Sequence, residues 1–161
     1  MSAHCYFELE CGELDMEAVN AAWNQLIQRH DVMRVVVLNN GLSQQILKDV
    51  PAYQIPINDY RNEDHLAFTN GVQATRNQMS QRRFDVSKWP LFDIEASLSP
   101  NQTTRLHVSF DNTVFDGYSI FLLFDEWYKL SYMPTQNLPT INISFRDYAI
   151  ALADLKKFHS V

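Results

Sequence analysis

Residues 103–124 read TTRLHVSFDNTVFDGYSIFLLF, a pattern typical of a strand, a loop and a helix in that order. Apolar and polar residues alternate up to Asp111, so the predicted strand has one apolar face and one polar face. The loop ends at Asp116-Gly117, immediately before an apolar helix. Polar groups at such a junction are well placed to meet a ligand. The polar face consists of Arg105, His107, Ser109 and Asp111.

Upstream, residues 91–98 also alternate, and the turn-like residues 99–102 join them to this strand as a hairpin. Another alternating strand is predicted at residues 4–11. It is followed by a helix that Asp15 caps and that has apolar residues at helical spacing. The apolar positions of this helix are Val19, Trp23, Leu26 and Ile27.

Three weaker patterns fill the interval between that helix and residue 91. Residues 33–38 and 43–47 predict two strands, with hairpin-turn chemistry at Asn39-Asn40-Gly41. Pro51 and Pro56 mark an extended edge segment, because proline cannot donate a hydrogen bond to a neighbouring strand. Residues 63–83 then predict a helix whose weak point is Gly71.

The C-terminal part predicts two more helices. The first covers residues 117–132, and we expect its apolar residues to pack in the core. Pro134 and Pro139 predict a rigid linker, and Ser144 to Asp147 resembles a capping box at the start of the last helix. Residues 1–161 therefore predict a single α+β or mixed α/β unit, with helices packed on a largely antiparallel or mixed sheet. The apolar residues of the first helix are Phe121, Phe124, Trp127 and Tyr128.

Composition excludes several classes of function. The formal charge of -6 and the lack of a basic stripe argue against a nucleic-acid partner. Without a long apolar run or a signal-peptide pattern, a soluble cytoplasmic protein is expected, with no membrane contact. Cys5 and Cys11 lie roughly 20 Å apart along one strand, so we expect two reduced thiols rather than a disulfide. No spacing of Cys and His suits a metal site.

A family resemblance rests on Asp111, Asp116 and Ser119, which match the Asp-x-x-x-x-Asp-x-x-Ser motif of heterocyclization domains at each fixed position. Condensation domains carry His-His-x-x-x-Asp-Gly at the same junction, and Asp111 and Asn112 stand where those histidines would be. The segment Gln28 to Arg34 resembles the Arg-His-acid-x-Leu-Arg signature of the superfamily, with Met33 at the leucine position. Similarity extends from about residue 4 to 155 and includes residues 84–94 and 144–148.

The chain therefore resembles the N-terminal lobe of a heterocyclization domain of a nonribosomal peptide synthetase. The resemblance implies a chloramphenicol-acetyltransferase-like lobe, with a tunnel between it and a missing C-terminal lobe. It also implies peptidyl or aryl carrier proteins as partners, whose phosphopantetheine arms enter the tunnel, and no cofactor bound directly. The whole domain would join an acyl thioester to carrier-bound Cys, Ser or Thr and close a thiazoline or oxazoline ring, for a siderophore or an antibiotic. An isolated lobe would be inactive.

Two rival functions remain open at this stage. One is a condensation domain that forms amides without closing rings, although the absence of the His-His pair argues against it. The other is a non-catalytic lobe that only docks carrier proteins. From the residues alone, Asp116 or Ser119 would simply cap a helix, and the polar strand face would simply meet water.

The resemblance also implies residue roles. Asp116 would form a buried salt bridge with Arg34, a structural role, while Asp111 would line the channel and orient an amine or a water molecule. Ser119 would hydrogen-bond Asp116 or cap the helix. His107 and Asn112 are further channel-lining candidates. We interpret His30 as structural, because it falls at a helix end.

Overall fold

The computed structural model of the protein describes residues 4–38, 43–133 and 137–158. Its main sheet has four strands in the order β1-β6-β5-β4. Strands β1 (His4–Cys11), β6 (Thr104–Asp111) and β5 (Phe92–Leu98) are antiparallel neighbours, whereas β4 (Ile57–Asp59) pairs with β5 in parallel. The expected mixed sheet is therefore present. A smaller sheet pairs β2 (Val35–Val37) with β3 (Gln44–Ile46).

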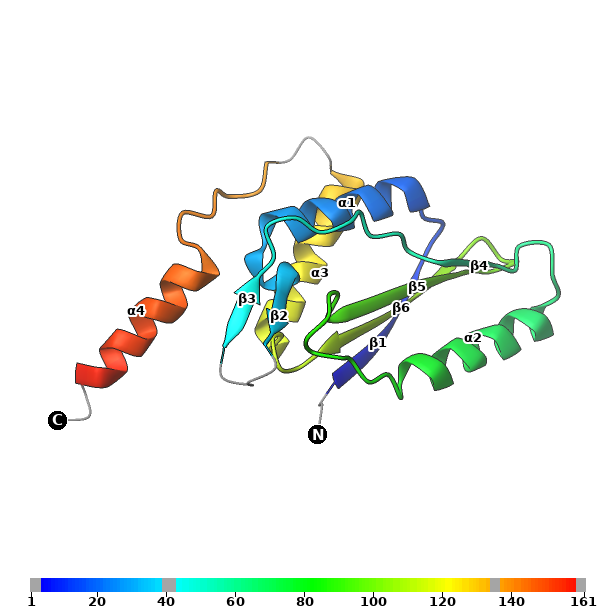
Figure 1. Cartoon of the computed structure of the whole chain (residues 1–161). Helices are drawn as coiled ribbons and strands as arrows, with labels where there is room; N and C mark the ends of the chain where they lie inside the picture. Colours follow the sequence, from blue (N-terminus) through cyan, green and yellow to red (C-terminus); the bar gives the residue numbers. More distant parts are fainter. Residues whose placement is uncertain (1–3, 39–42, 134–136, 159–161) are drawn as a thin grey trace.

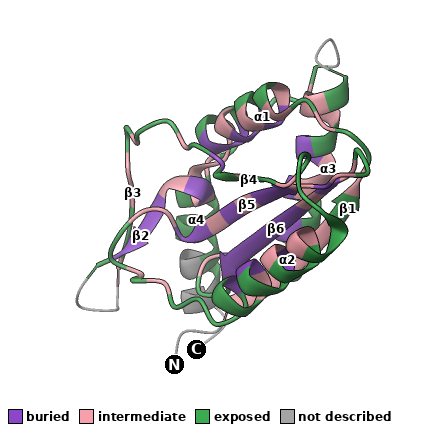
Figure 2. Ribbon diagram, turned by 90° about the vertical axis from the view of Figure 1, so that its right-hand side faces the viewer, coloured by how far each residue is buried: buried purple, intermediate pink, exposed green. Residues whose placement is uncertain are grey.

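Helices cover both faces of the main sheet (Figure 1). Helices α1 (Met16–Arg29) and α3 (Gly117–Tyr132) pack together on one face, and α2 (His65–Met79) lies on the other. Helix α4 (Phe145–Phe158) stands beside this three-layer body, at the end of an extended segment. In Figure 2, α2 lies in front of the buried strands β5 and β6 and turns an exposed side to solvent.

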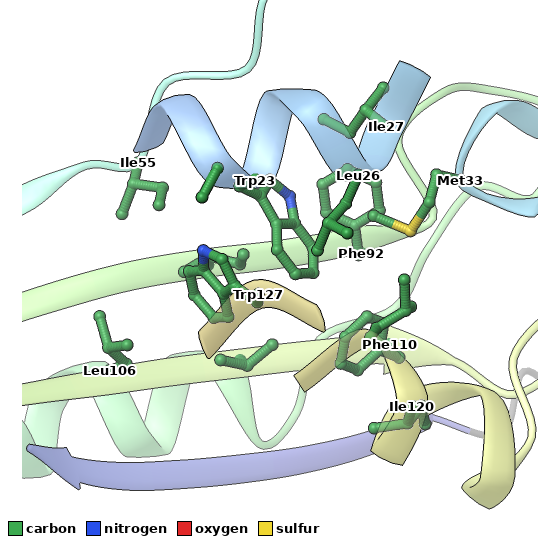
Figure 3. Close-up of a cluster of buried hydrophobic side chains, with 14 of the residues drawn as sticks. Trp23, Leu26, Ile27, Met33, Ile55, Phe92, Leu106, Phe110, Ile120 and Trp127 are labelled. Atoms are coloured by element: carbon green, nitrogen blue, oxygen red, sulfur yellow. The ribbon is translucent and has the colours of Figure 1, made fainter. Parts of the chain in front are cut away.

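The apolar face of the sheet forms the core with α1 and α3 (Figure 3). Trp23 of α1 has no exposed surface, and its ring centroid lies 4.6 Å from that of Trp127 and 5.3 Å from that of Phe92. The Trp127 indole N–H donates to the carbonyl of Val19, 2.9 Å away, which ties α3 to α1. Aromatic packing between α1, α3 and the sheet therefore fixes the position of both helices.

Local signals place the helix starts as expected. The Asp15 carboxylate accepts hydrogen bonds from the backbone N–H groups of Glu17 and Ala18, and the Ser144 hydroxyl accepts one from the N–H of Asp147. Helix α2 ends four residues short of the predicted end, residue 83. The expected weak point, Gly71, has a packing role, because a Cβ there would lie 2.1 Å from the hydroxyl oxygen of Tyr60.

Two features between α1 and α2 differ from the sequence predictions. The chain from 31 to 34 is a short 3-10 helix, so the strand predicted at 33–38 is reduced to β2. Strand β4 itself was not predicted. It follows an extended segment that α1 holds in place through two asparagines: the Asn24 amide exchanges hydrogen bonds with the backbone of Tyr53, and Asn20 accepts from the N–H of Ile55. The turn at 39–41 and Pro134 lie outside the described residues.

The expectation that the whole apolar stripe of α3 packs in the core is wrong. Trp127 is buried and Phe124 is partly buried, but Phe121 is 72% exposed and Tyr128 is 55% exposed. Helix α3 is apolar around much of its circumference, and the sheet and α1 cover only one side of it. Spacing alone did not reveal which side that is.

We expect Trp23→Ala to lower the free energy of unfolding by about 3 to 5 kcal/mol, because it empties the centre of the core. The matched change Phe121→Ala, on the exposed side of α3, is expected to cost less than about 0.5 kcal/mol. Urea unfolding of both variants measures the difference, and equal costs would contradict the assignment of the two faces.

Candidate functional site

The motif residues lie at the junction of β6, a short loop and α3. Asp111 is the last residue of β6 and has no exposed surface. Its carboxylate accepts a hydrogen bond from the N–H of Thr113 at 2.8 Å, and its carbonyl accepts from the N–H groups of Val114 and Phe115. The side chain and the carbonyl of Asp111 therefore shape the loop that leads to α3.

Asp116 is exposed and is the N-cap of α3. Its carboxylate accepts from the N–H of Ser119 at 2.7 Å. Hydrogen bonds from the Ser119 hydroxyl and backbone hold the pKa of Asp116 below its ordinary value. Of the two roles expected for Ser119, the structure shows the hydrogen bond to Asp116, because Asp116 itself occupies the cap position.

The expected buried salt bridge between Asp116 and Arg34 is not formed. The Arg34 guanidinium lies 2.9 Å from the carboxylate of Asp31 and donates to the carbonyls of Ile27, Leu47 and Lys48. The 3-10 turn after α1 surrounds Arg34 with these local acceptors, which engage its donors. Arg34 therefore joins α1 to the segment after β3, and Asp116 remains at the surface.

The polar face of β6 is covered by α2 rather than open to water or to a channel (Figure 2). His107, one of the channel-lining candidates, has no exposed surface. Its Nδ1 lies 2.7 Å from the hydroxyl of Tyr6, and its Nε2 lies 3.2 Å from the hydroxyl of Ser97. The next polar residue, Ser109, donates to the carbonyl of Met79 in α2.

These contacts belong to a chain of hydrogen bonds between the sheet and α2. Tyr6 donates to a Glu8 carboxylate oxygen at 2.8 Å, so His107 Nδ1–H donates to Tyr6 and Nε2 accepts from Ser97. Arg76 of α2 donates to the other Glu8 oxygen at 2.8 Å, and Arg105 also binds Glu8.

The environment of the network sets its charges. Burial lowers the pKa of His107 from 6.5 to about 4, despite the nearby Glu8 carboxylate, and the cations Arg105 and Arg76 act in the same direction as burial. The Arg76 guanidinium lowers the pKa of Glu8 to about 2. Burial and the Glu8 carboxylate raise the pKa of Tyr6. At neutral pH, His107 is therefore neutral and Glu8 is ionised.

A second charged cluster holds α1 to α3. Glu126 of α3 is 6% exposed, and its carboxylate lies 2.6 Å from His30 Nε2 and 3.1 Å from Arg29 Nε. Arg29 also donates to the carbonyl of Pro139, in the segment that leads to α4. His30 is the C-cap of α1, as expected, but the partner of its side chain is a carboxylate on another helix.

The structure thus brings Asp111, Asn112, Asp116 and Ser119 together at one loop, while the Arg34 side chain pairs with Asp31. Asn112 is exposed beside the buried Asp111. Sequence reasoning missed the partners of His107, which come from β1 and β5. Alternation along residues 4–11 placed Tyr6 and Glu8 on one polar face, but only the strand register brings Glu8 opposite His107.

The described part of the chain has neither a metal-binding cluster nor a membrane-spanning helix. Within residues 4–38, 43–133 and 137–158, no group of His, Cys, Asp or Glu side chains has the geometry to hold a metal ion. Over the same part of the chain, no helix has both the length and the apolar composition needed to span a bilayer. Cys5 and Cys11 are free thiols.

Comparisons with known proteins agree with this architecture. The sequence profile of the family described as Condensation domain matches residues 2–159. Pyochelin synthetase PchF of Pseudomonas aeruginosa is 28% identical over 136 residues, and phenyloxazoline synthase MbtB of a Mycobacterium species is 26% identical over 151 residues. These matches cover 84% and 94% of this chain, but only 7% and 12% of the relatives.

Among solved structures, the EpoB cyclization-docking bidomain of the nonribosomal peptide synthetase from Sorangium cellulosum matches with a TM-score of 0.87 and 32% identity. The match covers 96% of this chain and 30% of that chain, so this chain spans less than a third of the EpoB bidomain. The predicted fold class, a chloramphenicol-acetyltransferase-like lobe with a mixed sheet and packed helices, is confirmed.

We expect the unfolding free energy to depend on His107 between pH 6.5 and pH 5. The folded state holds His107 neutral down to a pKa of about 4, whereas the unfolded chain protonates near 6.5. Stability is therefore lost as the pH falls, by about 2 kcal/mol over this interval. Urea unfolding of the wild type and of His107→Gln at both pH values measures it. The loss should shrink in His107→Gln and persist in the exposed-site control His65→Gln; an unchanged loss in His107→Gln would refute the assignment.

We expect Asp116→Ala to cost about 1 kcal/mol of unfolding free energy, the value of a helix cap, and Asp116→Asn to cost less, because Asn also caps helices. Thermal and urea unfolding check these values. The costs of Asp116→Ala and Arg34→Ala should be additive in the double variant. A loss of about 3 to 5 kcal/mol with strong coupling to Arg34 would show that Asp116 and Arg34 do form a buried ion pair.

Proposed function

Because this chain belongs to the condensation-domain family of nonribosomal peptide synthetases, we propose that it is the N-terminal lobe of a heterocyclization domain. The observation that carries the proposal is the motif Asp111-x-x-x-x-Asp116-x-x-Ser119 at the junction of β6 and α3, where condensation domains have a His-His motif. The similarity to the EpoB cyclization bidomain and to a phenyloxazoline synthase supports the same assignment.

The proposed reaction has two stages. The amine of a carrier-bound Cys, Ser or Thr attacks the thioester carbonyl of an acyl group on a second carrier protein, and the phosphopantetheine thiol leaves as the amide forms. The side-chain thiol or hydroxyl then adds to the new amide carbonyl, and loss of water closes a thiazoline or oxazoline ring. Both substrates arrive on carrier arms, so holding them in line supplies much of the rate gain.

The motif residues divide into two roles in this proposal. Asp111 and Asn112 lie at the end of β6. The exposed Asn112 is the candidate for orienting an amine or a water molecule, and the buried Asp111 shapes the loop that holds Asn112 in place. Asp116 and Ser119 act as positioning residues, because their hydrogen bonds start α3 beside that loop. Asp111 therefore acts in this proposal by positioning rather than by proton transfer.

The rest of the proposed domain lies outside this chain. A C-terminal lobe would supply the other wall of a tunnel, and peptidyl or aryl carrier proteins would deliver substrates to its two ends. No cofactor would bind the lobe directly. We place the reaction in the cytoplasm and in a pathway to a siderophore or an antibiotic. The 161-residue chain alone should not catalyse, because one wall of the tunnel would be missing.

The deciding experiment is intact mass spectrometry of carrier-bound product. The polypeptide that contains this chain and the rest of its domain is mixed with both loaded carrier proteins, using Cys, Ser and Thr in turn. We expect a product lighter by one water than the linear amide, because the ring closes with loss of water. Asp111→Asn should reduce its formation, whereas Asp59→Asn, at an exposed acidic side chain in β4 at the other end of the sheet, is the matched control.

Other outcomes separate the rival functions. Linear amide without the lighter product would indicate a condensation domain that does not close rings. No product from any pair, with carrier proteins still bound, would indicate a docking lobe. Turnover by the 161-residue chain alone would contradict the need for a second lobe.

A further inference from the structure

The antiparallel register places His4, the first residue of β1, directly opposite Asp111, the last residue of β6. Both side chains are on the polar face of the sheet, because their neighbours Cys5 and Phe110 contact the core on the other face. In Figure 1, β1 begins at the end of the sheet where β6 finishes. A histidine from another strand therefore stands beside the first aspartate of the motif.

The hydrogen-bond pattern brings these two side chains close together. The Asp111 N–H donates to the Leu91 carbonyl, on the β5 side, so the preceding residue, Phe110, directs its backbone groups toward β1. Phe110 and Cys5 therefore form a hydrogen-bonded pair, and His4 and Asp111 form the adjoining non-hydrogen-bonded pair. In such a pair the Cα atoms are only about 4.5 Å apart and the side chains are in reach of each other. This pairing is internal to the lobe and does not depend on what lies beyond the outer edge of β1.

The two side chains differ in exposure. Asp111 has no exposed surface, whereas His4 is half-buried. The loop that begins at Asp111 also carries the exposed Asn112, the candidate for orienting the amine. Of the pair, His4 is therefore the better placed to meet a substrate at this loop.

The other histidines among the described residues have different positions. His107 is buried in the hydrogen-bond network under α2, and His30 binds Glu126 between α1 and α3. His65 begins α2, whose opposite end contacts β6 next to the motif. His4 is therefore the described histidine that shares the motif end of the sheet.

The proposed reaction requires a group that carries a proton at this loop. As the C–N bond forms, the amine nitrogen loses a proton, and as the C–S bond breaks, the phosphopantetheine sulfur gains one. The amide of Asn112 and the hydroxyl of Ser119 do not exchange protons readily near neutral pH, and Asp111 shapes the loop. Imidazole is the side chain that takes up and releases protons in this range.

We propose that His4 is the proton carrier of amide formation, a catalytic residue that the motif does not contain. This inference rests on the proposed function. A carboxylate accepts several hydrogen bonds, so Asp111 can hold one ring nitrogen of His4 while it accepts from the Thr113 N–H. The other ring nitrogen takes the proton of the attacking amine and gives it to the sulfur that leaves, so the ring ends the step neutral.

The groups beside this pair on the polar face have partners of their own. Tyr6, the next residue of β1 on this face, is hydrogen-bonded to His107. Ser109, opposite Tyr6, donates to a carbonyl of α2. Asp111 is therefore the charged group that directly faces His4 across the two strands.

The rival role for His4 is purely structural. In that role the ring would only hold the start of β1 against β6 by pairing with Asp111. Glutamine at position 4 also donates a hydrogen bond, so it would preserve a structural role, but it cannot carry a proton. Comparison of an alanine and a glutamine variant therefore separates the two roles.

The test measures the rate of amide formation, linear and cyclised together, by the full domain with both loaded carrier proteins. We expect His4→Ala and His4→Gln each to lower kcat by about 100-fold, the effect of losing a positioned acid-base group, with little change in KM for the carriers. Added imidazole should restore part of the rate of His4→Ala, because a free ring can occupy the space that the side chain leaves, and this rescue also shows that the variant is folded. His65→Gln, at the far end of α2, is the matched control and should keep the wild-type rate.

The remaining outcomes are distinct from one another. A wild-type rate in His4→Gln would reduce His4 to a structural residue, and a slow His4→Ala domain that imidazole does not accelerate would exclude His4 as the proton carrier. Both results leave heterocyclization intact, because the wild-type domain still forms its product. If the wild-type domain itself forms no amide, the proposed function fails and the role of His4 fails with it.

Discussion

Strand β6 is buried on both faces, and the rest of the structure depends on the different chemistry of those faces. Val108 and Phe110 point into an aromatic core under α1 and α3, while His107 and Ser109 hydrogen-bond to groups under α2. Because successive side chains point to opposite faces, a shift of one residue would exchange the two environments. The register of β6 with β1 and β5 therefore decides at once how all three layers assemble.

The hydrogen bonds between the sheet and α2 define the relative position of their side chains more narrowly than the apolar core does. An aromatic core tolerates small displacements, but the contacts of His107 with Tyr6 and Ser97 require one orientation of each partner. Helix α2 buries few apolar side chains, chiefly Val72 and Met79, so polar contacts such as Arg76 with Glu8 have a large share in placing it. A strand face that looks solvent-exposed in sequence is thus an internal polar interface.

Much of the fold was predictable because its signals are local. Asp15 and Ser144 cap the helices that they precede, and alternation locates β1, β5 and β6. Strand β4 was not predictable, because its three residues pair with β5 nearly forty positions away and Asn20 and Asn24 hold the segment before it. The candidate site shows the same difference between local and long-range interactions. The cap formed by Asp116 depends on its neighbours in sequence, whereas the partner of Arg34 depends on which acceptors the folded chain brings near it.

The contacts of Arg29 have a mechanical consequence for the chain after α3. One guanidinium binds a carboxylate of α3 and the carbonyl of Pro139, so the segment leading to α4 is fastened where α1 meets α3. Through Arg29, the packing of α1 against α3 therefore also determines where the segment that leads to α4 leaves the body of the lobe.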